Sequence, residues 1–133
     1  MKTFNKTKPR KSTKVPFKIL DENEIIVTIY RDVTGAERLP FIIHRKVRDF
    51  DTGGYVRGMW QITHALTGYS MGIYGSYLFC RAVANDLMGQ PILYLPCQKM
   101  MTKHEDFHTI TRMIEEVSAK HQHLNPVPSL PSP

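Results

Sequence analysis

The sequence has little of what marks secreted, membrane-spanning and nucleotide-hydrolysing proteins. Two cysteines in 133 residues, Cys80 and Cys97, are too few for a disulfide framework and are typical of reduced thiols inside a cell. The longest apolar run, GIYGSYLFC, falls well short of the roughly 18–20 residues of a membrane span, and no secretory signal is visible. Neither of the glycine-rich phosphate-binding patterns, G-x-x-x-x-G-K-S/T and G-x-G-x-x-G, occurs. These absences predict a cytoplasmic protein without membrane contact.

Negative charge is missing from the first 14 residues. They contain six of the 18 lysines and arginines and none of the 12 aspartates and glutamates, so the formal excess of +6 belongs entirely to this segment. Because the segment is also poor in aliphatic residues, its composition predicts a disordered basic arm over residues 1–14. Four prolines in residues 124–133 predict a Pro-rich tail at the other end. A single domain over residues 15–123 lies between them.

Alternating and β-branched residues predict an antiparallel sheet of about four strands. Residues 24–32 and 41–48 have the composition of strands, and Gly35 supplies a turn between them. Residues 59–75 have the alternation and the central turn of a hairpin. The short apolar run at residues 91–95 is compatible with a fifth strand.

Two segments after the predicted hairpin have helical patterns. Ser76 is a suitable N-cap for residues 77–88, which are apolar on nearly every side and are therefore expected to be buried. Residues 103–122 carry an apolar stripe at three- and four-residue steps. Strands followed by two helices predict an α+β fold, in which the antiparallel sheet has both helices packed on one face.

The alternation within residues 41–48 separates two faces of the predicted sheet. Phe41, Ile43 and Val47 share one face, which is expected to contact the core. Arg45 falls on this apolar face, an irregularity that a strand end or a β-bulge accommodates. The opposite, outer face carries Ile42, His44, Lys46 and Arg48.

The segment KHEDFH contains the H-E-x-x-H pattern of many zinc peptidases, formed by His104, Glu105 and His108. Such enzymes need a third ligand, and the downstream carboxylates lie on the same predicted helix, where they cannot reach back to the histidine pair. Thr102 and Glu105 also have the spacing of a capping box, which places the pair in the first helical turn. We interpret the pattern as a helix start and predict no cofactor. A zinc-dependent hydrolase, or a non-catalytic zinc site that includes Cys97, is kept as an alternative.

The charge distribution favours a polyanionic partner. A flexible arm with six cations binds phosphates and releases their counterions, and the outer sheet face adds further cations and Tyr30, a ring on which an unpaired base can stack. Tyr55 and Arg57 in the following loop extend this surface, whereas Trp60 is assigned to the core. The residues predicted to contact nucleic acid are Lys6, Lys8, Arg10, Lys11, Lys14, Tyr30, His44, Lys46 and Arg48.

The predicted function is therefore binding to DNA or RNA as a small non-enzymatic accessory or regulatory protein. An acidic protein surface is another partner that a cationic arm fits, so a protein-binding inhibitor or adaptor is the alternative. A homo-oligomer formed by strand pairing is compatible with both functions. Deletion of residues 1–14 is expected to leave the fold intact and to weaken the retention of nucleic acid.

Overall fold

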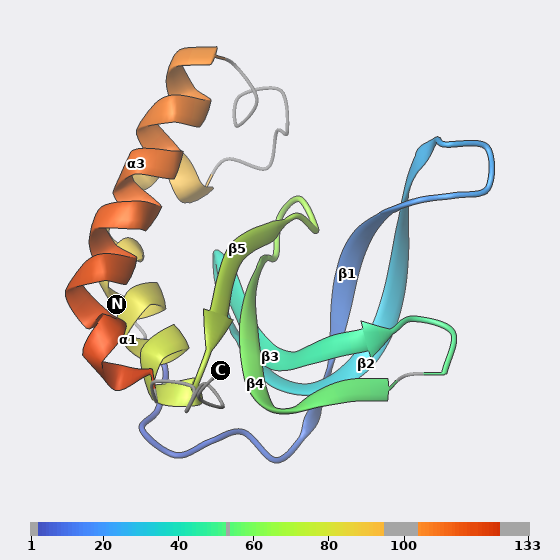
Figure 1. Ribbon diagram of the computed structural model, residues 1–133, viewed down its shortest axis with the longest axis horizontal. Coiled ribbons are helices and arrows are strands. Elements are labelled where there is room, and N and C mark those ends of the chain that lie inside the picture. The colour runs from blue at the N-terminus through green and yellow to red at the C-terminus, as the bar shows by residue number, and fades with distance from the viewer. Residues whose placement is uncertain (1–2, 53, 95–103, 126–133) are drawn as a thin grey trace, which may run out of the picture.

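The computed structural model describes residues 3–52, 54–94 and 104–125, with side chains from residue 108 onward in the last range. These residues form a five-stranded antiparallel sheet and two α-helices (Figure 1), so the predicted α+β fold is confirmed. The strands follow one another in the sheet in chain order. They are β1 (Ser12–Leu20), β2 (Ile26–Arg38), β3 (Phe41–Asp49), β4 (Gly54–His64) and β5 (Ser70–Gly75).

The fifth strand of this sheet is β1, which the sequence patterns did not predict. Residues 91–95 do not supply it: Pro91–Tyr94 form a 3-10 helix, η1, and Leu95 lies outside the described residues. Proline has no N–H to give to a strand ladder, and the N–H of Leu93 donates instead to the carbonyl oxygen of Gln90 at 3.1 Å. A tight helical turn therefore replaces the expected strand.

The strand predicted at residues 24–32 continues through Gly35 to Arg38 instead of turning at the glycine. Gly35 is buried where β2 crosses β3, and a Cβ at this position would lie 2.5 Å from the carbonyl oxygen of Ile43 and 2.6 Å from the Cβ of His44. The missing side chain thus permits a close approach of two strands. The chain reverses later, at Leu39 and Pro40.

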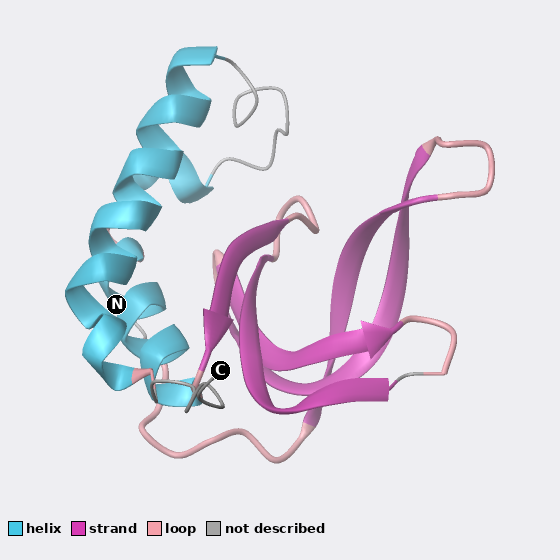
Figure 2. Ribbon diagram, viewed as in Figure 1, coloured by secondary structure: helices cyan, strands magenta, loops and turns pink. Residues whose placement is uncertain are grey.

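The sheet is strongly curled. β1 pairs with β2 along its whole length, whereas β2 pairs with β3 only through its last four residues, Gly35–Arg38. The β1–β2 ribbon therefore swings away from β3 and rises as a long hairpin on the side of the sheet opposite the helices (Figure 2). The backbone N–H of Lys18 in β1 donates to the carbonyl oxygen of Gly68, between β4 and β5, at 3.1 Å. This hydrogen bond ties β1 to the far end of the sheet.

Because of the curl, both faces of β3 are buried in separate hydrophobic cores. The larger core lies between the sheet and the helices and receives Phe41 and Ile43. The smaller core lies inside the curl, where Ile42 packs with Val15 and Phe17 of β1. The face of β3 that the sequence analysis treats as open to solvent is thus covered by the β1–β2 ribbon.

The two helices form two layers on the same side of the sheet. α1 (Tyr77–Leu87) contacts β3, β4 and β5, and α3 (His104–His121) packs mainly against α1, followed by the 3-10 helix η2 (Gln122–Leu124). The predicted N-cap of the first helix is correct: the Ser76 hydroxyl accepts a hydrogen bond from the N–H of Phe79 at 3.1 Å. Ile110 of α3 is buried in the larger core, with Met113, Ile114 and Val117 beside it.

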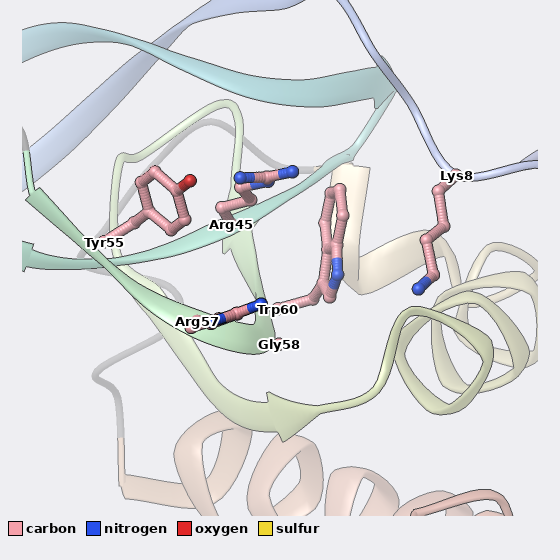
Figure 3. A pocket seen from close by; sticks show the side chains of 6 residues that line it. All are labelled: Lys8, Arg45, Tyr55, Arg57, Gly58 and Trp60. Carbon is pink, nitrogen blue, oxygen red and sulfur yellow. The ribbon is translucent and has the colours of Figure 1, made fainter.

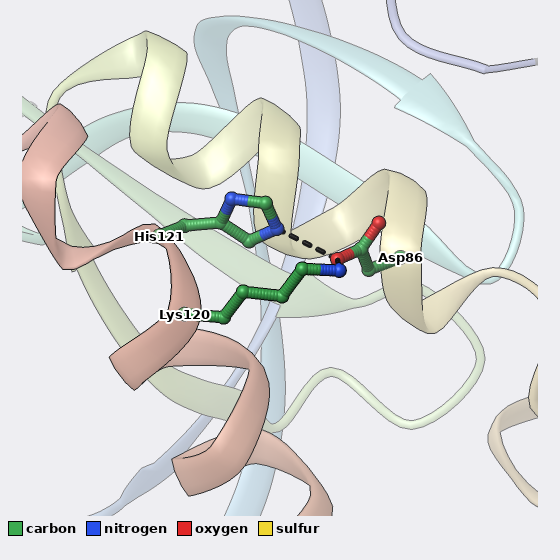
Figure 4. Close-up of polar contacts among 3 residues, drawn as sticks. All are labelled: Asp86, Lys120 and His121. Atoms are coloured by element: carbon green, nitrogen blue, oxygen red, sulfur yellow. Dashed lines mark hydrogen bonds and ion pairs between the residues drawn. The ribbon is translucent and has the colours of Figure 1, made fainter.

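Asp86 links the two helices through polar contacts. Its carboxylate lies 2.6 Å from Nε2 of His121 and 3.2 Å from Nζ of Lys120, both in the last turn of α3 (Figure 4). The hydrogen bond from His121, followed by that from Lys120, lowers the pKa of Asp86. The contact fixes the C-terminal end of α3 beside α1.

The N-terminal segment is attached to the folded body, unlike the free arm predicted over residues 1–14. Phe4 is 2% exposed and belongs to the larger core. Its N–H donates to Oδ1 of Asn85 at 3.0 Å, and its carbonyl oxygen accepts from Nε of Arg81 at 3.1 Å. The Tyr77 hydroxyl donates to the carbonyl oxygen of Asn5. Burial of one aromatic ring stabilises the order of an otherwise polar segment, and residues 12–14 already belong to β1.

The start of the predicted tail over residues 124–133 also contributes to the folded body. Oδ1 of Asn125 accepts a hydrogen bond from the N–H of Ser76 at 2.9 Å, and the hydroxyl of Ser76 donates to the carbonyl oxygen of Leu124 at 2.8 Å. Residues 126–133 lie outside the described part of the chain. Leu124 and Asn125 thus complete the N-terminal end of α1.

Candidate nucleic-acid interface

A break in the β3–β4 pairing lies beside a hollow lined by basic side chains. Arg45 pairs with Trp60, and Val47 pairs with Tyr55. One residue of β3 therefore lies between Arg45 and Val47, whereas four residues of β4 lie between Tyr55 and Trp60. Gly58, within this bulge, has a φ of 75°, a conformation that glycine adopts without strain. The bulge predicted as one way to accommodate Arg45 is therefore present at that residue.

The bulge also resets the alternation of β3. Arg45 stays on the face of Phe41 and Ile43 and pairs with Trp60, which belongs to the larger core. Val47, predicted to share that face, packs instead against the smaller core inside the curl. An arginine is therefore placed at the rim of a hydrophobic core, where an uninterrupted strand would place an apolar side chain.

Side chains from the N-terminal segment, β3 and β4 surround a hollow of about 580 Å³ beside this bulge, which we call the basic pocket (Figure 3). Three cationic and two aromatic residues line it, and none of its lining residues is acidic. Lys8 approaches from one side of Trp60, and Arg45 and Tyr55 lie on the other (Figure 3). The basic pocket is lined by Lys8, Arg45, Tyr55, Arg57, Gly58 and Trp60.

Aromatic rings hold the guanidinium group of Arg45. Its Cζ atom lies 4.6 Å from the centre of the Tyr55 ring and 5.9 Å from that of the Trp60 ring, within the range of cation–π attraction. Within the described residues, no ion pair joins Arg45 to a carboxylate. The charge of Arg45 is thus positioned and remains available to an anion.

The two aromatic residues of the pocket differ in accessibility. Trp60 is 4% exposed and packs edge-on against Tyr77, with ring centres 5.3 Å apart, which confirms its assignment to the core. Tyr55 is 46% exposed. Trp60 therefore forms a wall of the pocket, and Tyr55 offers a ring to a ligand.

The cations predicted in the N-terminal segment are exposed, but the structure separates them. Lys8 is the member that lines the basic pocket, and Lys6, Arg10 and Lys11 lie along the same segment. Lys14 lies in β1, with its ammonium group 6.0 Å from the centre of the Tyr30 ring. The predicted cationic arm thus becomes a row of charges fixed at two points, Phe4 and β1.

Tyr30 and Lys14 line a smaller hollow of about 300 Å³ beside the turn between β4 and β5. Lys18 adds a second cation, but Glu37 also lines this hollow and reduces its positive potential. The predicted pairing of Tyr30 with basic side chains is therefore present, in a less basic setting than the pocket beside Trp60.

Lys46 and Arg48 do not join Tyr30 on a common surface. The ammonium group of Lys46 lies 4.5 Å from the centre of the Tyr74 ring in β5. Arg48 is exposed near Gly54, at the C-terminal end of β3. The outer surface predicted from the alternation of β3 is divided because the bulge and the curl separate its members.

His44 is buried, whereas the sequence pattern predicts that it projects from an open face. It is 0% exposed inside the curl, with its ring edge-on to Phe17 at 5.3 Å. Its Nδ1 donates to the carbonyl oxygen of Arg45 at 2.8 Å, and its Nε2 accepts from the Thr63 hydroxyl at 2.7 Å. Burial lowers the pKa of His44 from 6.5 to about 4. The side chain is a neutral part of the smaller core and is inaccessible to nucleic acid.

His64 is a second buried histidine with both ring nitrogens satisfied. Its Nε2 donates to the carbonyl oxygen of Leu93, and its Nδ1 accepts from the Thr67 hydroxyl at 2.8 Å. Burial lowers its pKa as well. Burial also raises the pKa of the Cys80 thiol to about 12, so this side chain stays protonated and unreactive. These three side chains have structural roles.

The H-E-x-x-H pattern lies at the start of α3, as predicted. His104 is the first residue of the helix, and His108 follows one turn later. The side chains of residues 104–107 lie outside the described residues, as do Thr102 and Cys97. Within the described residues, no three His, Cys, Asp or Glu side chains lie close enough together to hold a metal ion.

Comparison with protein-family models, with curated proteins and with solved structures finds no match to this chain. The described helices include none with the length and apolar character required to span a bilayer. The chemistry of the basic pocket is therefore the basis for a functional assignment. The sequence predicts Lys8 as a phosphate contact but not its place in this pocket. It does not predict Arg45 as a site residue, although the off-pattern position of Arg45 was a usable signal.

Proposed function

We propose that the protein binds nucleic acid, DNA or RNA, as a non-enzymatic accessory or regulatory factor, through the basic pocket and the adjoining N-terminal segment. The observation that carries the proposal is the convergence of Lys8, Arg45 and Arg57 around Tyr55 and Trp60 without an acidic residue in the lining. Phosphate groups satisfy such cations, and each contact releases a condensed counterion. Aromatic rings among the cations add a surface for bases.

The arrangement supports affinity with little sequence preference. Lys8 and Arg57 are exposed side chains that contact phosphate as mobile charges, whereas Arg45 is held between two rings. Contacts to phosphate position a nucleic acid without reading its bases. Arg10 and Lys11 follow Lys8 in the chain and lead to Lys14, which lines the hollow beside Tyr30, and Lys6 precedes Lys8.

The proposal is tested by nucleic-acid binding of charge variants. Arg45→Gln and Arg57→Gln are each expected to weaken the binding of a short oligonucleotide roughly tenfold at low salt and to flatten the dependence of affinity on salt. Arg112→Gln, an exposed site on α3, is the matched control with the same loss of charge. Equal affinity of the pocket variants, the control and the wild-type protein would contradict the proposal.

Substitution is a better test than deletion of the N-terminal segment. Residues 1–14 include Phe4 and the first residues of β1, so their removal opens the larger core as well as removing charge. Lys8→Gln removes the pocket's third cation and leaves Phe4 in place. It is expected to weaken binding less than Arg45→Gln, because the lysine is a flexible point charge.

A second candidate function, protein binding, is favoured by the tip of the β1–β2 hairpin. Three large aliphatic residues there are 53–64% exposed, beside a turn rich in carboxylates. The aliphatic residues are Leu20, Ile25 and Ile26, and the acidic residues are Asp21, Glu22 and Glu24. The chain itself carries a complementary basic surface, so a second copy is the partner that this tip fits.

Sedimentation velocity at increasing protein concentration tests self-association through the tip. The wild-type protein is expected to form salt-sensitive assemblies, and the double variant Ile25→Ser with Ile26→Ser is expected to stay monomeric. A wild-type protein that is monomeric at every concentration would exclude this partner.

A further inference from the structure

The shape of the basic pocket limits which nucleic acid can enter it. A concave site of about 580 Å³ lies within the usual range of sites for small ligands, which is the size class of a single nucleotide. A duplex is convex, and its bases face one another in the interior. Its phosphates can touch the rim of such a site, but its bases cannot enter. A base that is already unpaired can turn outward from its strand and lie in the pocket.

Tyr55 is the surface on which such a base can stack. Arg45 lies over the Tyr55 ring with its Cζ atom 4.6 Å from the ring centre, and the residue is nevertheless 46% exposed, so part of the ring remains open to a ligand. Trp60, at 4% exposure, offers no comparable face.

The cations of the pocket come from separate parts of the chain. Arg57 of β4 is exposed on the same side of Trp60 as Tyr55 and Arg45, and Lys8 of the N-terminal segment is exposed on the other side of Trp60 (Figure 3). A stacked nucleotide has a phosphate on each side of its sugar, and cations from separate parts of the chain can meet both. Gly58 has no side chain to narrow the entrance.

We infer that the basic pocket binds one unpaired nucleotide of a single strand, with its base on Tyr55 and its flanking phosphates held by Arg45, Arg57 and Lys8. This inference rests on the proposed function and narrows it to single-stranded nucleic acid. Tyr55 is the base-stacking residue, and Arg45 holds the ring in position as well as binding phosphate. Tyr30, the stacking candidate from the sequence, lies outside this pocket.

The protein contains its own reporter of the pocket. Trp60 is the single tryptophan of the chain and lines the site, so its fluorescence responds to a group that enters there. The full-length protein is titrated with a short oligothymidylate, a hairpin duplex of the same length, an abasic strand of the same length and a mononucleotide. Binding is measured separately by the anisotropy of a labelled strand.

The oligothymidylate is expected to change Trp60 emission with the same midpoint as the anisotropy, and more tightly than the other three ligands. Tyr55→Ala is expected to lower affinity for the strand roughly 5- to 150-fold, the range that corresponds to the loss of one stacked base. Tyr55→Phe keeps the ring and is expected to keep the affinity. Tyr30→Ala is the matched control and is expected to retain wild-type binding.

Different results would overturn different claims. If the strand binds by anisotropy but the duplex or the abasic strand binds equally well, or Tyr55→Ala has no effect, the nucleotide pocket is wrong while nucleic-acid binding stands. If Tyr30→Ala lowers the affinity for the strand and Tyr55→Ala does not, the base stacks at the hollow beside Tyr30 and not in the basic pocket. A mononucleotide that binds as tightly as the strand would identify a free phosphorylated ligand. If none of the polymers binds at low salt, the proposed function fails as well.

Discussion

Two groups of cationic side chains in the described residues have different surroundings. At the junction of α1 and α3, Lys120 and His121 contact the Asp86 carboxylate. In the basic pocket, Arg45 contacts two aromatic rings, and neither it nor Arg57 or Lys8 has a described carboxylate partner. Paired charges fasten one element to another, whereas unpaired charges beside an open hollow keep their attraction for a ligand. The contrast separates charges that stabilise the fold from charges that can bind.

Phe4→Ala is expected to have the largest effect. It tests whether the burial of Phe4 in the larger core keeps Lys8 at the pocket. Truncating a buried phenylalanine costs about 3–5 kcal/mol of unfolding free energy. Loss of the anchor also releases the segment that carries Lys8. Chemical denaturation measures the first effect, and strand affinity of the still-folded fraction measures the second. An unchanged denaturation midpoint would show that the segment is not held by its ring.

Acid is expected to reduce the stability that depends on the buried His44 and to leave the charge of the pocket arginines unchanged. The pKa of His44 is about 4 in the folded protein and 6.5 when unfolded, so the unfolded chain takes up a proton more readily between these values. The stability that His44 provides above pH 6.5 is therefore lost as the pH falls toward 4, by about 3 kcal/mol. Arginine does not titrate in this range.

Thermal unfolding between pH 7 and pH 4 measures this loss, with His44→Gln as the comparison. The variant is expected to be less stable at pH 7 and to show a weaker decline with acid. Strand binding is expected to persist while the protein stays folded. A wild-type stability that is flat over this range would contradict the role of His44.

A matched pair of substitutions compares the two groups of charges directly. Arg57→Gln is expected to reduce the slope of log affinity against log salt by about 0.7 for a single strand, as for one phosphate contact. Lys120→Gln removes the same charge at a site already paired with Asp86, and the slope is expected to stay unchanged. Titrations at several salt concentrations give both slopes. Equal slopes for the two variants would remove the distinction between the groups.

Asp86→Asn is expected to have the smallest effect. Contacts with His121 and Lys120 lower the pKa of Asp86, so its contribution to stability is present above pH 3.8 and is lost as the pH falls below that value. The carboxylate is partly exposed, and solvent screening limits the contribution to about 0.5 kcal/mol. Denaturation measures this change, and strand binding is expected to be the same as in the wild-type protein.

The sequence predicts the local features of this fold better than its long-range ones. The N-cap at Ser76, both helices and the core position of Trp60 depend on residues near one another in the chain, and the structure has each of them. The irregular position of Arg45 predicts a bulge because alternation along a strand is local. The burial of His44 depends on the distant strand β1, which no pattern within β3 reveals.

The pocket was only partly visible in the sequence for the same reason. Tyr55 and Arg57 were expected to extend a basic surface, and they line the pocket with Trp60. Lys8 reaches this group because Phe4 anchors the N-terminal segment on α1. One phenylalanine among lysines and threonines is a weak signal, and its burial becomes evident only once the core is assembled.

Both described ends of the chain form hydrogen bonds at α1, and this has a consequence for biosynthesis. Tyr77 and Arg81 hold residues near the N-terminus, and Ser76 is met by Asn125, 49 positions later in the chain. A ribosome must therefore release the chain as far as Asn125 before the hydrogen bonds around Ser76 are complete. Until then, α1 lacks the hydrogen bonds from Ser76 to Leu124 and Asn125. A polypeptide that stops before Asn125 therefore lacks a contact at the start of a helix that is synthesised much earlier.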